Sequence, residues 1–144
     1  MSYLVDIGDI ASIDVWGPTV QARMLRGENA SLAVVELAPN ATVPGHRHAH
    51  EQLGICLQGS ITFTVGGETR ELGPGGTWRI PSDLPHDAVA GPDGAVVIDI
   101  FSPVRTDWSG LPKSAPGAGR WPAVGQPSVR PRSPGGHTSE GSPP

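Results

Sequence analysis

The sequence predicts an all-β fold, a jelly-roll β-barrel or sandwich followed by a Pro/Gly-rich C-terminal tail. Between residues 20 and 101, short stretches of β-branched and apolar residues recur at roughly ten-residue spacing, with Gly or Pro between them. No stretch shows the sustained periodicity of an amphipathic helix. Gly66-Gly67 is a strong two-residue hairpin signal, because both glycines accept positive φ. About eight short strands joined by such turns are typical of jelly rolls and sandwiches.

The expected strands follow one another with short turns between them. Their ranges are 20–26, 31–38, 46–57, 60–65, 68–72, 77–80, 85–90 and 95–101. In the fourth of them, Ile61, Phe63 and Val65 alternate with threonines, so these apolar side chains are expected to face the interior. Trp78 and Ile80 are expected to face inward for the same reason.

The chain is expected to hold one domain, residues 1–109, and a basic tail, residues 110–144. A length of 144 residues suits a single domain with its own core. Gly and Pro are dense in the tail, where the apolar alternation ends. The domain carries 6 Lys/Arg and 13 Asp/Glu (−7) and the tail 4 and 1 (+3), which sum to the net charge of −4. An acidic body therefore carries a basic tail.

The composition argues against several classes of protein. No apolar segment approaches the ~20 residues of a membrane-spanning helix, so no membrane partner is expected. The acidic body argues against a nucleic acid partner. The single cysteine, Cys56, cannot form an internal disulfide, and the first residues lack a basic segment followed by an apolar run. We therefore expect a soluble, cytoplasmic protein.

A run of metal-competent side chains lies near the middle of the domain. In PGHRHAHEQ, His46, His48, His50 and Gln52 fall on every second residue. Such residues share one face of an extended strand, whereas residues two apart on a helix point to different sides. The Pro-Gly pair before the run favours a turn into a strand. The run therefore predicts one strand that aims three imidazoles and an amide at one place.

Two motifs make the chain resemble a single-domain cupin over about residues 20–104. The first cupin motif, G-x5-H-x-H-x3-E-x6-G, is similar to residues 40–59, and the second, G-x5-P-x-G-x2-H-x3-N, is similar to residues 75–90. The departures are Asn40 and Asp83 at Gly positions, Gln52 at the Glu position and Ala90 at the Asn position. The resemblance implies the cupin jelly roll and a metal site.

By this resemblance, His46, His48, Gln52 and His86 are metal ligands. The strand periodicity adds His50, either as a further ligand or as a residue that a bulge turns away. Gln52 is either a ligand or a hydrogen-bonding neighbour of one. A neutral set without a carboxylate suits Zn, Ni or Co better than iron. The expected cofactor is a divalent metal acting as a Lewis acid, with Zn as first choice and Ni, Co, Mn or Fe as alternatives.

Within cupins, the run HRHAHEQ and the ending IDIFSP resemble two groups. One is the metal-dependent polyketide cyclases of actinobacterial antibiotic biosynthesis, of the resistomycin and tetracenomycin type. The other opens unsaturated uronates in pectin and alginate breakdown. The leading hypothesis is an aldol cyclisation of a poly-β-keto intermediate, whose enolate a metal with neutral ligands would stabilise. The alternatives are ring opening or isomerisation of an unsaturated uronate, a cupin dioxygenase, and a small-molecule binder without turnover.

The expected catalytic residues are His50, Asp99 and Arg23. His50 and Asp99 are candidate bases, although Asp99 could instead end a strand and pair with an Arg. Arg23 is expected at the cavity wall, with an outer-face position as its alternative. A uronate would require a cation in the cavity, and the candidates are Arg23 and Arg79, which favours the polyketide.

The expected partner is a small-molecule substrate, presented in the leading hypothesis by an acyl carrier protein. The tail cations Lys113, Arg120, Arg130 and Arg132 would dock an acidic carrier, and Trp121 would anchor the tail on the barrel. The alternative is a solvated tail without function. A homodimer is a further open possibility.

Overall fold

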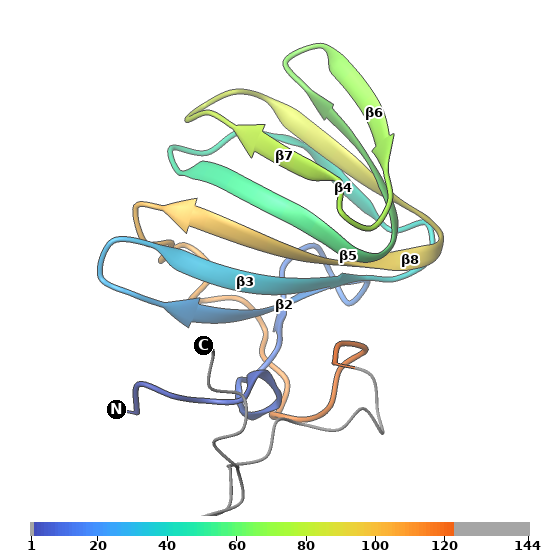
Figure 1. Ribbon diagram of the computed structural model, residues 1–144. Coiled ribbons are helices and arrows are strands. Elements are labelled where there is room, and N and C mark those ends of the chain that lie inside the picture. The colour runs from blue at the N-terminus through green and yellow to red at the C-terminus, as the bar shows by residue number, and fades with distance from the viewer. Residues whose placement is uncertain (1, 123–144) are drawn as a thin grey trace, which may run out of the picture.

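The computed structural model describes residues 2–122, which form antiparallel β-strands and one short 3-10 helix, η1 (Ile7–Asp9) (Figure 1). The predicted all-β fold is confirmed. The strands are β1 (Ile13–Asp14), β2 (Val20–Arg26), β3 (Ser31–Leu37), β4 (Thr42–His46), β5 (Glu51–Val65), β6 (Glu68–Leu72), β7 (Thr77–Ile80) and β8 (His86–Ser102).

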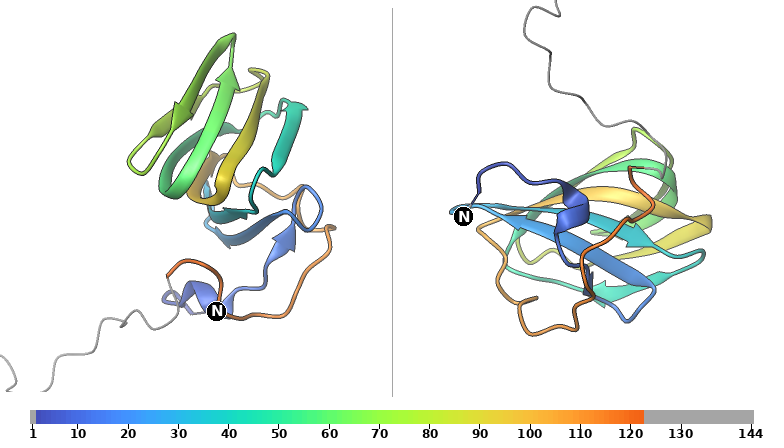
Figure 2. Two further views of the ribbon diagram at one scale, coloured as in Figure 1. Left: turned by 90° about the vertical axis from the view of Figure 1, so that its right-hand side faces the viewer. Right: turned by 90° about the horizontal axis from the view of Figure 1, so that it is seen from below.

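The strands form two layers that share β5 and β8 (Figure 2). In the first layer, the strands pair in the order β1, β2, β3, second half of β8, first half of β5. Strand β7 pairs with the other side of β5. In the second layer, β4 pairs with the first half of β8, and β6 pairs with the second half of β5. The space between the layers holds the core and a cavity.

Strands β5 and β8 each run unbroken through both layers, although the sequence predicts two separate strands in the place of each. Their mutual pairing shifts register twice around Gly59. Gly59 and Gly94 both have φ of 75° at this bend. Glycine adopts positive φ without steric cost, so the backbone can bend here without ending the strand.

Positive φ values explain both the predicted hairpin and two departures from the cupin motifs. Gly66 and Gly67, with φ of 55° and 86°, form the expected turn between β5 and β6. Asn40 and Asp83 have φ of 59° and 61° and stand where the motifs have glycine. Asn and Asp tolerate the left-handed region better than other non-glycine residues. The substitutions therefore preserve the backbone geometry of the motif.

The core lies between the layers and follows the predicted alternation. Ile61, Phe63, Trp78 and Ile80 are all buried, and the rings of Phe63 and Trp78 lie 4.5 Å apart. They belong to one apolar cluster that also includes residues of β2, β3 and β8. Packing between the layers therefore fixes the inner faces of the strands that carry the site.

The described part of the tail, residues 110–122, runs along the outside of the barrel (Figure 1). Ile13 and Lys113 form an isolated β-bridge. Arg120 makes polar contacts with the barrel, by donating to backbone carbonyls of β3 and β8. Trp121 is half-buried, and its role as anchor stays a prediction. The boundary after residue 109 and the docking role of the tail stay predictions, and the tail cations Arg130 and Arg132 lie outside the described residues.

Within residues 2–122, no helix has the length and apolar character needed to cross a bilayer. The outer face of the first layer nevertheless carries an apolar row. The register aligns Leu25, Leu32, Ile100 and Leu53 across four neighbouring strands, and Leu25, Leu53 and Ile100 are at least 40% exposed. Exposed apolar surface of this kind marks interaction sites. The homodimer stays a prediction, for which this row is the surface to test.

Candidate metal centre

The histidine run does not form one strand, and the predicted strand over 46–57 is wrong over residues 47–50. His46 ends β4, residues 47–50 are irregular, and Gln52 lies in β5. Strand β4 belongs to the second layer and the start of β5 to the first, so the residues between them have to cross from one layer to the other. The ligand candidates therefore converge from separate segments and not from one face of a strand.

Three histidines nevertheless meet at one place. His46, His48 and His86 offer ring nitrogens that lie within 4.8 Å of one another. In each ring Nδ1 lies 2.9 Å from a backbone carbonyl two residues away, that of Pro44, His50 and Leu84 respectively. A carbonyl only accepts, so each Nδ1 carries the proton and donates it. The lone pair of each Nε2 is then free to bind a metal.

The electrostatics of these histidines suit a cation. Burial, assisted by the nearby Arg105 charge, lowers the pKa of His48 to about 4, and burial also lowers the pKa of His86. Both rings are therefore neutral at pH 7, as metal ligands must be. Nε2 of His86 is buried and has no hydrogen-bond partner among residues 2–122. A divalent metal would supply that partner, so the residues present fit the implied metal, whose identity they leave open.

Gln52 presents a fourth donor. Its Oε1 lies 3.2 Å from Nε2 of His48, and its Nε2 donates to Oδ1 of Asp99 at 2.9 Å. A carboxylate accepts hydrogen bonds, so Asp99 decides which end of the amide faces the histidines. Because Nδ1 of His48 holds the proton, Oε1 of Gln52 and Nε2 of His48 are two acceptors that face each other. That contact is favourable when a cation binds both atoms.

Asp99 lies behind Gln52 and lines the cavity, where the sequence predicts it. Its carboxyl is buried, and burial raises its pKa to about 6, although hydrogen bonds from Gln52 and Trp78 oppose the rise. Nε1 of Trp78 donates to the same Oδ1 at 2.8 Å. Gly54 leaves room for this arrangement, because a Cβ at that position would overlap both Trp78 and Asp99. The carboxyl is thus held by two donors and titrates near neutrality.

His50 lies beside the three-histidine group and outside it. Its ring centroid is 5.7 Å from that of His48, and its backbone carbonyl accepts the hydrogen bond from Nδ1 of His48. Its own Nδ1 is buried without a hydrogen-bond partner in the described chain. Strand periodicity does not hold over residues 47–50, so it no longer argues for His50 as a ligand. The roles of ligand and of base stay predictions for this residue.

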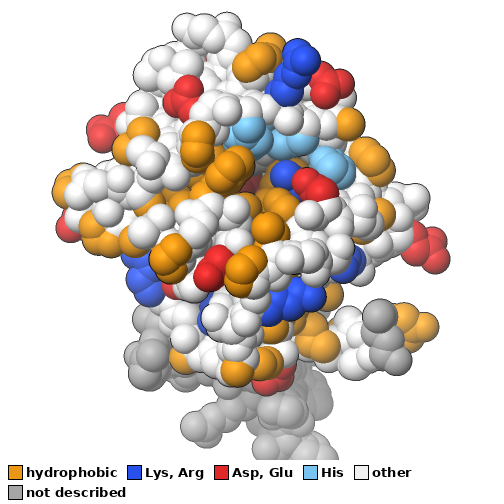
Figure 3. Space-filling view, turned by 180° about the vertical axis from the view of Figure 1, so that it is seen from behind, with side chains coloured by type: hydrophobic (Ala, Val, Ile, Leu, Met, Phe, Trp, Pro, Cys, Tyr) orange, Lys and Arg blue, Asp and Glu red, His pale blue; other side chains and the backbone are white. Residues whose placement is uncertain are grey.

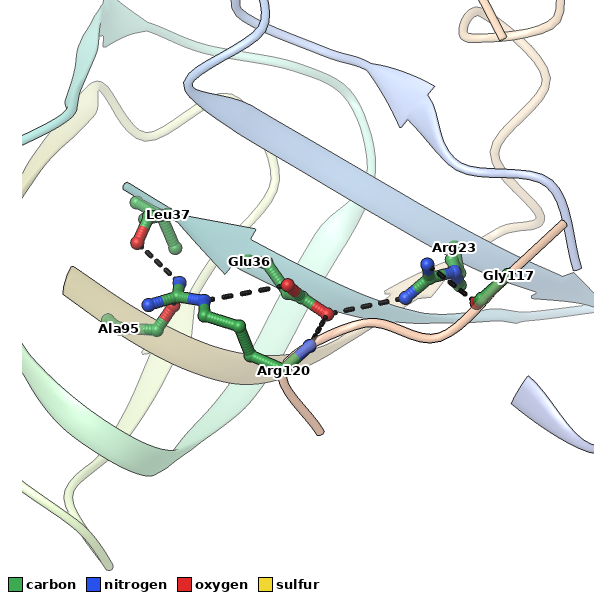
Figure 4. Close-up of polar contacts among 6 residues, drawn as sticks. All are labelled: Arg23, Glu36, Leu37, Ala95, Gly117 and Arg120. Atoms are coloured by element: carbon green, nitrogen blue, oxygen red, sulfur yellow. Dashed lines mark hydrogen bonds and ion pairs between the residues drawn. The ribbon is translucent and has the colours of Figure 1, made fainter. Parts of the chain in front are cut away.

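Arg23 does not reach the cavity wall. Val20, Ala22 and Met24 are the inward residues of β2, and Arg23 has the opposite parity. Its Nη1 lies 3.3 Å from Oε2 of Glu36, and its Nη2 donates to the Gly117 carbonyl at 3.0 Å, under the described tail (Figure 4). The prediction of a cavity position is therefore corrected to the outer-face alternative.

Arg105 is the cavity cation that sequence reasoning missed. It follows β8, lines the cavity and has a side chain that is 7% exposed. Its guanidinium lies over the rings of Phe101 and Trp108, 4.7 and 4.4 Å from their centroids. Nε and Nη2 donate to the two carboxylate oxygens of Asp107 at 2.9 and 3.1 Å. The one sequence signal was the segment RTDW, which places a carboxylate and an aromatic ring close to the arginine.

The remaining cavity wall is apolar and comes from both layers. Figure 3 shows His side chains gathered at the edge of a hollow with much hydrophobic surface. The polar members of the lining are His46, Gln52, His86, Asp87, Asp99 and Arg105. An apolar cavity with a few convergent polar groups is the usual composition of a small-molecule site.

These features define a two-layer β-barrel protein with a metal-competent small-molecule site. The chain belongs to the cupin domain family, whose model matches residues 33–101. It is 30% identical over 82 residues to the pectin degradation protein KdgF of Dickeya dadantii, an alignment that covers 56% of this chain and 74% of that one.

The chain is similar to two further proteins. The structure of KdgF from Halomonas sp. superposes with a TM-score of 0.67 at 30% identity and covers 74% of this chain and 97% of that one. Dimethylsulfoniopropionate lyase DddW of Ruegeria pomeroyi is 29% identical over 79 residues, 55% of this chain. The matched part spans about half of DddW, 52% of its length. Two of these three relatives are KdgF proteins, and the third is a lyase.

Replacing Gln52 by glutamate is expected to preserve metal binding and to lower turnover by about tenfold or more. The new carboxylate would face Asp99 where an amide now donates to it, so one of the two acids would hold a proton near neutral pH. Metal content by mass spectrometry and the pH profile of turnover are the measurements. Unchanged turnover with an unchanged profile would show that the amide is dispensable.

Proposed function

We propose that the protein catalyses the metal-assisted ring opening of a small unsaturated uronate, which is an isomerisation. The observation that carries the proposal is Arg105, a buried cation at the wall of the cavity that holds the metal-competent group. The KdgF relative from Dickeya dadantii, named for the degradation of pectin, a polymer of uronic acid, supports the same substrate class.

Arg105 is suited to binding the uronate carboxylate. Asp107 occupies the guanidinium edge formed by Nε and Nη2. Nη1 makes no hydrogen bond to the described residues. Together with the second hydrogen of Nη2, it can donate to both oxygens of a second carboxylate. The rings of Phe101 and Trp108 hold the guanidinium plane in place. A substrate carboxylate bound there would fix one end of the sugar ring.

Asp99 is suited to move the proton that ring opening requires. The proton leaves the anomeric hydroxyl, the bond between the anomeric carbon and the ring oxygen breaks to give an aldehyde, and the enol that remains takes a proton at the former alkene carbon to become a ketone. The reaction needs no other reactant. With a pKa of about 6, Asp99 can both accept and return that proton near neutral pH.

The histidine and Gln52 donors would hold the metal beside this carboxyl. A divalent cation in that place would polarise a substrate oxygen and ease loss of its proton. The apolar wall excludes water, which strengthens these electrostatic interactions. Gln52 links the two parts, because its amide oxygen faces the histidines and its nitrogen donates to Asp99.

The sequence favours a polyketide over a uronate because it offers few candidate cations for the cavity, Arg23 and Arg79. Both of these lie elsewhere, since Arg23 pairs with Glu36 and Arg79 is exposed on β7. Arg105 provides the cation that a carboxylate substrate requires. An apolar cavity would also hold a poly-β-keto chain, so this substrate belongs in the assay as a competitor.

The direct test incubates metal-loaded protein with an unsaturated uronate released from pectin by a lyase. We expect loss of the ultraviolet absorbance of the conjugated alkene well above the spontaneous rate, and the ring-opened ketone as product by NMR. A parallel assay uses a poly-β-keto mimic. No acceleration with the uronate, together with cyclisation of the mimic, would overturn the proposal in favour of a cyclase.

Replacing Arg105 by glutamine is expected to raise KM for the uronate by about 30-fold or more, because a buried charged hydrogen bond to the carboxylate is lost. Metal content should stay the same. Arg79→Gln is the matched control, since that arginine is exposed and lies on the outer face of β7. Equal KM values for the two variants would mean that Arg105 does not bind the substrate carboxylate.

A further inference from the structure

We propose that Trp16 forms a stacking surface at the mouth of the cavity for the closed sugar ring. This inference rests on the proposed function and adds to it the side chain that recognises the ring, whereas Arg105 recognises the carboxylate. It also predicts a direction of selectivity, for the closed ring over the opened product.

Trp16 lies where a substrate ring has to pass. It lines the cavity together with Asp99 and Arg105, and 37% of its surface remains exposed. Its ring centroid is 5.1 Å from that of His46, with 56° between the planes. The indole thus stands beside the metal-competent group while part of it stays open to solvent. A large aromatic side chain that is neither buried nor remote from the cavity has surface left for a ligand.

The backbone holds Trp16 in this position before any ligand arrives. It lies in the tight connection between β1 and β2, where Trp16 and Pro18 form an isolated bridge. The backbone N–H of Val15 donates to the Val20 carbonyl at 2.9 Å. Gly17, with φ of 68°, allows the sharp turn. A ring fixed in this way loses little conformational freedom when a ligand stacks on it.

The chemistry of the ligand follows from this placement. A pyranose ring presents a row of C–H groups on one face, and an aromatic face with its negative quadrupole attracts such groups. The unsaturated ring is flatter than a saturated one and presents more contact surface. The opened product is a linear keto acid without such a face. Trp16 should therefore bind substrate more strongly than product, which favours release after the reaction.

A purely structural role for Trp16 makes a different prediction. If the indole served only to hold His46 in place, its removal would weaken metal binding and leave the affinity of the loaded protein for uronates unchanged. If it stacks on the substrate, metal binding would stay the same and ligand affinity would fall. The two roles are separated by measuring metal and ligand independently.

The experiment compares Trp16→Ala and Trp16→Phe with the wild type, all metal-loaded, and Tyr3→Ala serves as a control because Tyr3 is 97% exposed and absent from the cavity lining. Binding of galacturonic acid, a saturated uronate that has no alkene and so cannot form the ketone product, is measured by calorimetry, and KM with the unsaturated uronate is measured separately. We expect Trp16→Ala to weaken both by about tenfold, with metal content and kcat nearly unchanged. Trp16→Phe should recover most of the loss.

Four outcomes would overturn the inference. Unchanged affinity and KM in Trp16→Ala, with an active wild type, would show that Trp16 does not touch the ring while the proposed function stands. Loss of metal would assign Trp16 to the support of His46. Stronger binding of a dimethylsulfonio carboxylate than of galacturonic acid, lost in Trp16→Ala, would assign the indole to a cation. A wild type that neither binds nor converts uronates would overturn the proposed function and this inference with it.

Discussion

Replacing His86 with alanine is expected to leave a folded protein that no longer retains a stoichiometric divalent metal ion. Nε2 of His86 is buried and unpaired among residues 2–122, and it lies within reach of the nitrogens of His46 and His48. Loss of a hydrogen-bonding neighbour of a ligand already costs 10–100-fold in metal affinity, so loss of a ligand should cost more than about 100-fold. Ring opening of the uronate should fall with the metal.

Metal content by mass spectrometry after dialysis against a weak chelator is the measurement. His50→Ala is the matched control for metal content, because the structure leaves that ring outside the three-histidine group. A His86→Ala protein that keeps a full equivalent of metal would refute the site. Loss of metal from His50→Ala as well would restore His50 as a ligand.

Local patterns in the sequence predict the first and last residues of most strands and the side chains that face the core. The ranges 20–26, 68–72 and 77–80 agree with β2, β6 and β7. Turn residues and alternation are local, so neighbouring residues decide these elements. The histidine run fails because its backbone is decided by the separation of the two layers, which is a tertiary property. Perfect two-residue spacing is therefore compatible with a crossing segment.

The two arginines show opposite limits of sequence reasoning. The position of Arg23 could have been predicted, because Val20, Ala22 and Met24 share the apolar parity of β2 and leave Arg23 on the other face. The position of Arg105 could not, because it lies outside both cupin motifs in a segment without regular structure. Its side chain is placed by Phe101, Trp108 and Asp107, and such packing has no period in the sequence.

Replacing Asp99 with asparagine is expected to reduce turnover by about 10²–10⁴-fold, the usual contribution of a positioned acid or base. Asparagine has nearly the same shape, and its Oδ1 can still accept from Gln52 and Trp78. Metal content and KM for the uronate should therefore change little. Steady-state kinetics on metal-loaded protein is the measurement, and a kcat within a few-fold of wild type would exclude Asp99 as the group that moves the proton.

The same variant has a second readout in the metal-free protein. The pKa of Asp99 rises from 3.8 to about 6 on folding, so its contribution to stability is full at low pH and is lost as pH rises through 6. The pKa of His48 falls from 6.5 to about 4, so its contribution is full above pH 6.5 and is lost as pH falls through 4. In the wild type these two dependences oppose each other across the same window. Asp99→Asn removes the first, so Tm of the metal-free variant should rise more steeply between about pH 4 and 6 than Tm of the wild type. Parallel Tm profiles for the two proteins would show that Asp99 titrates in its ordinary range and is not the buried acid that the proposed reaction requires.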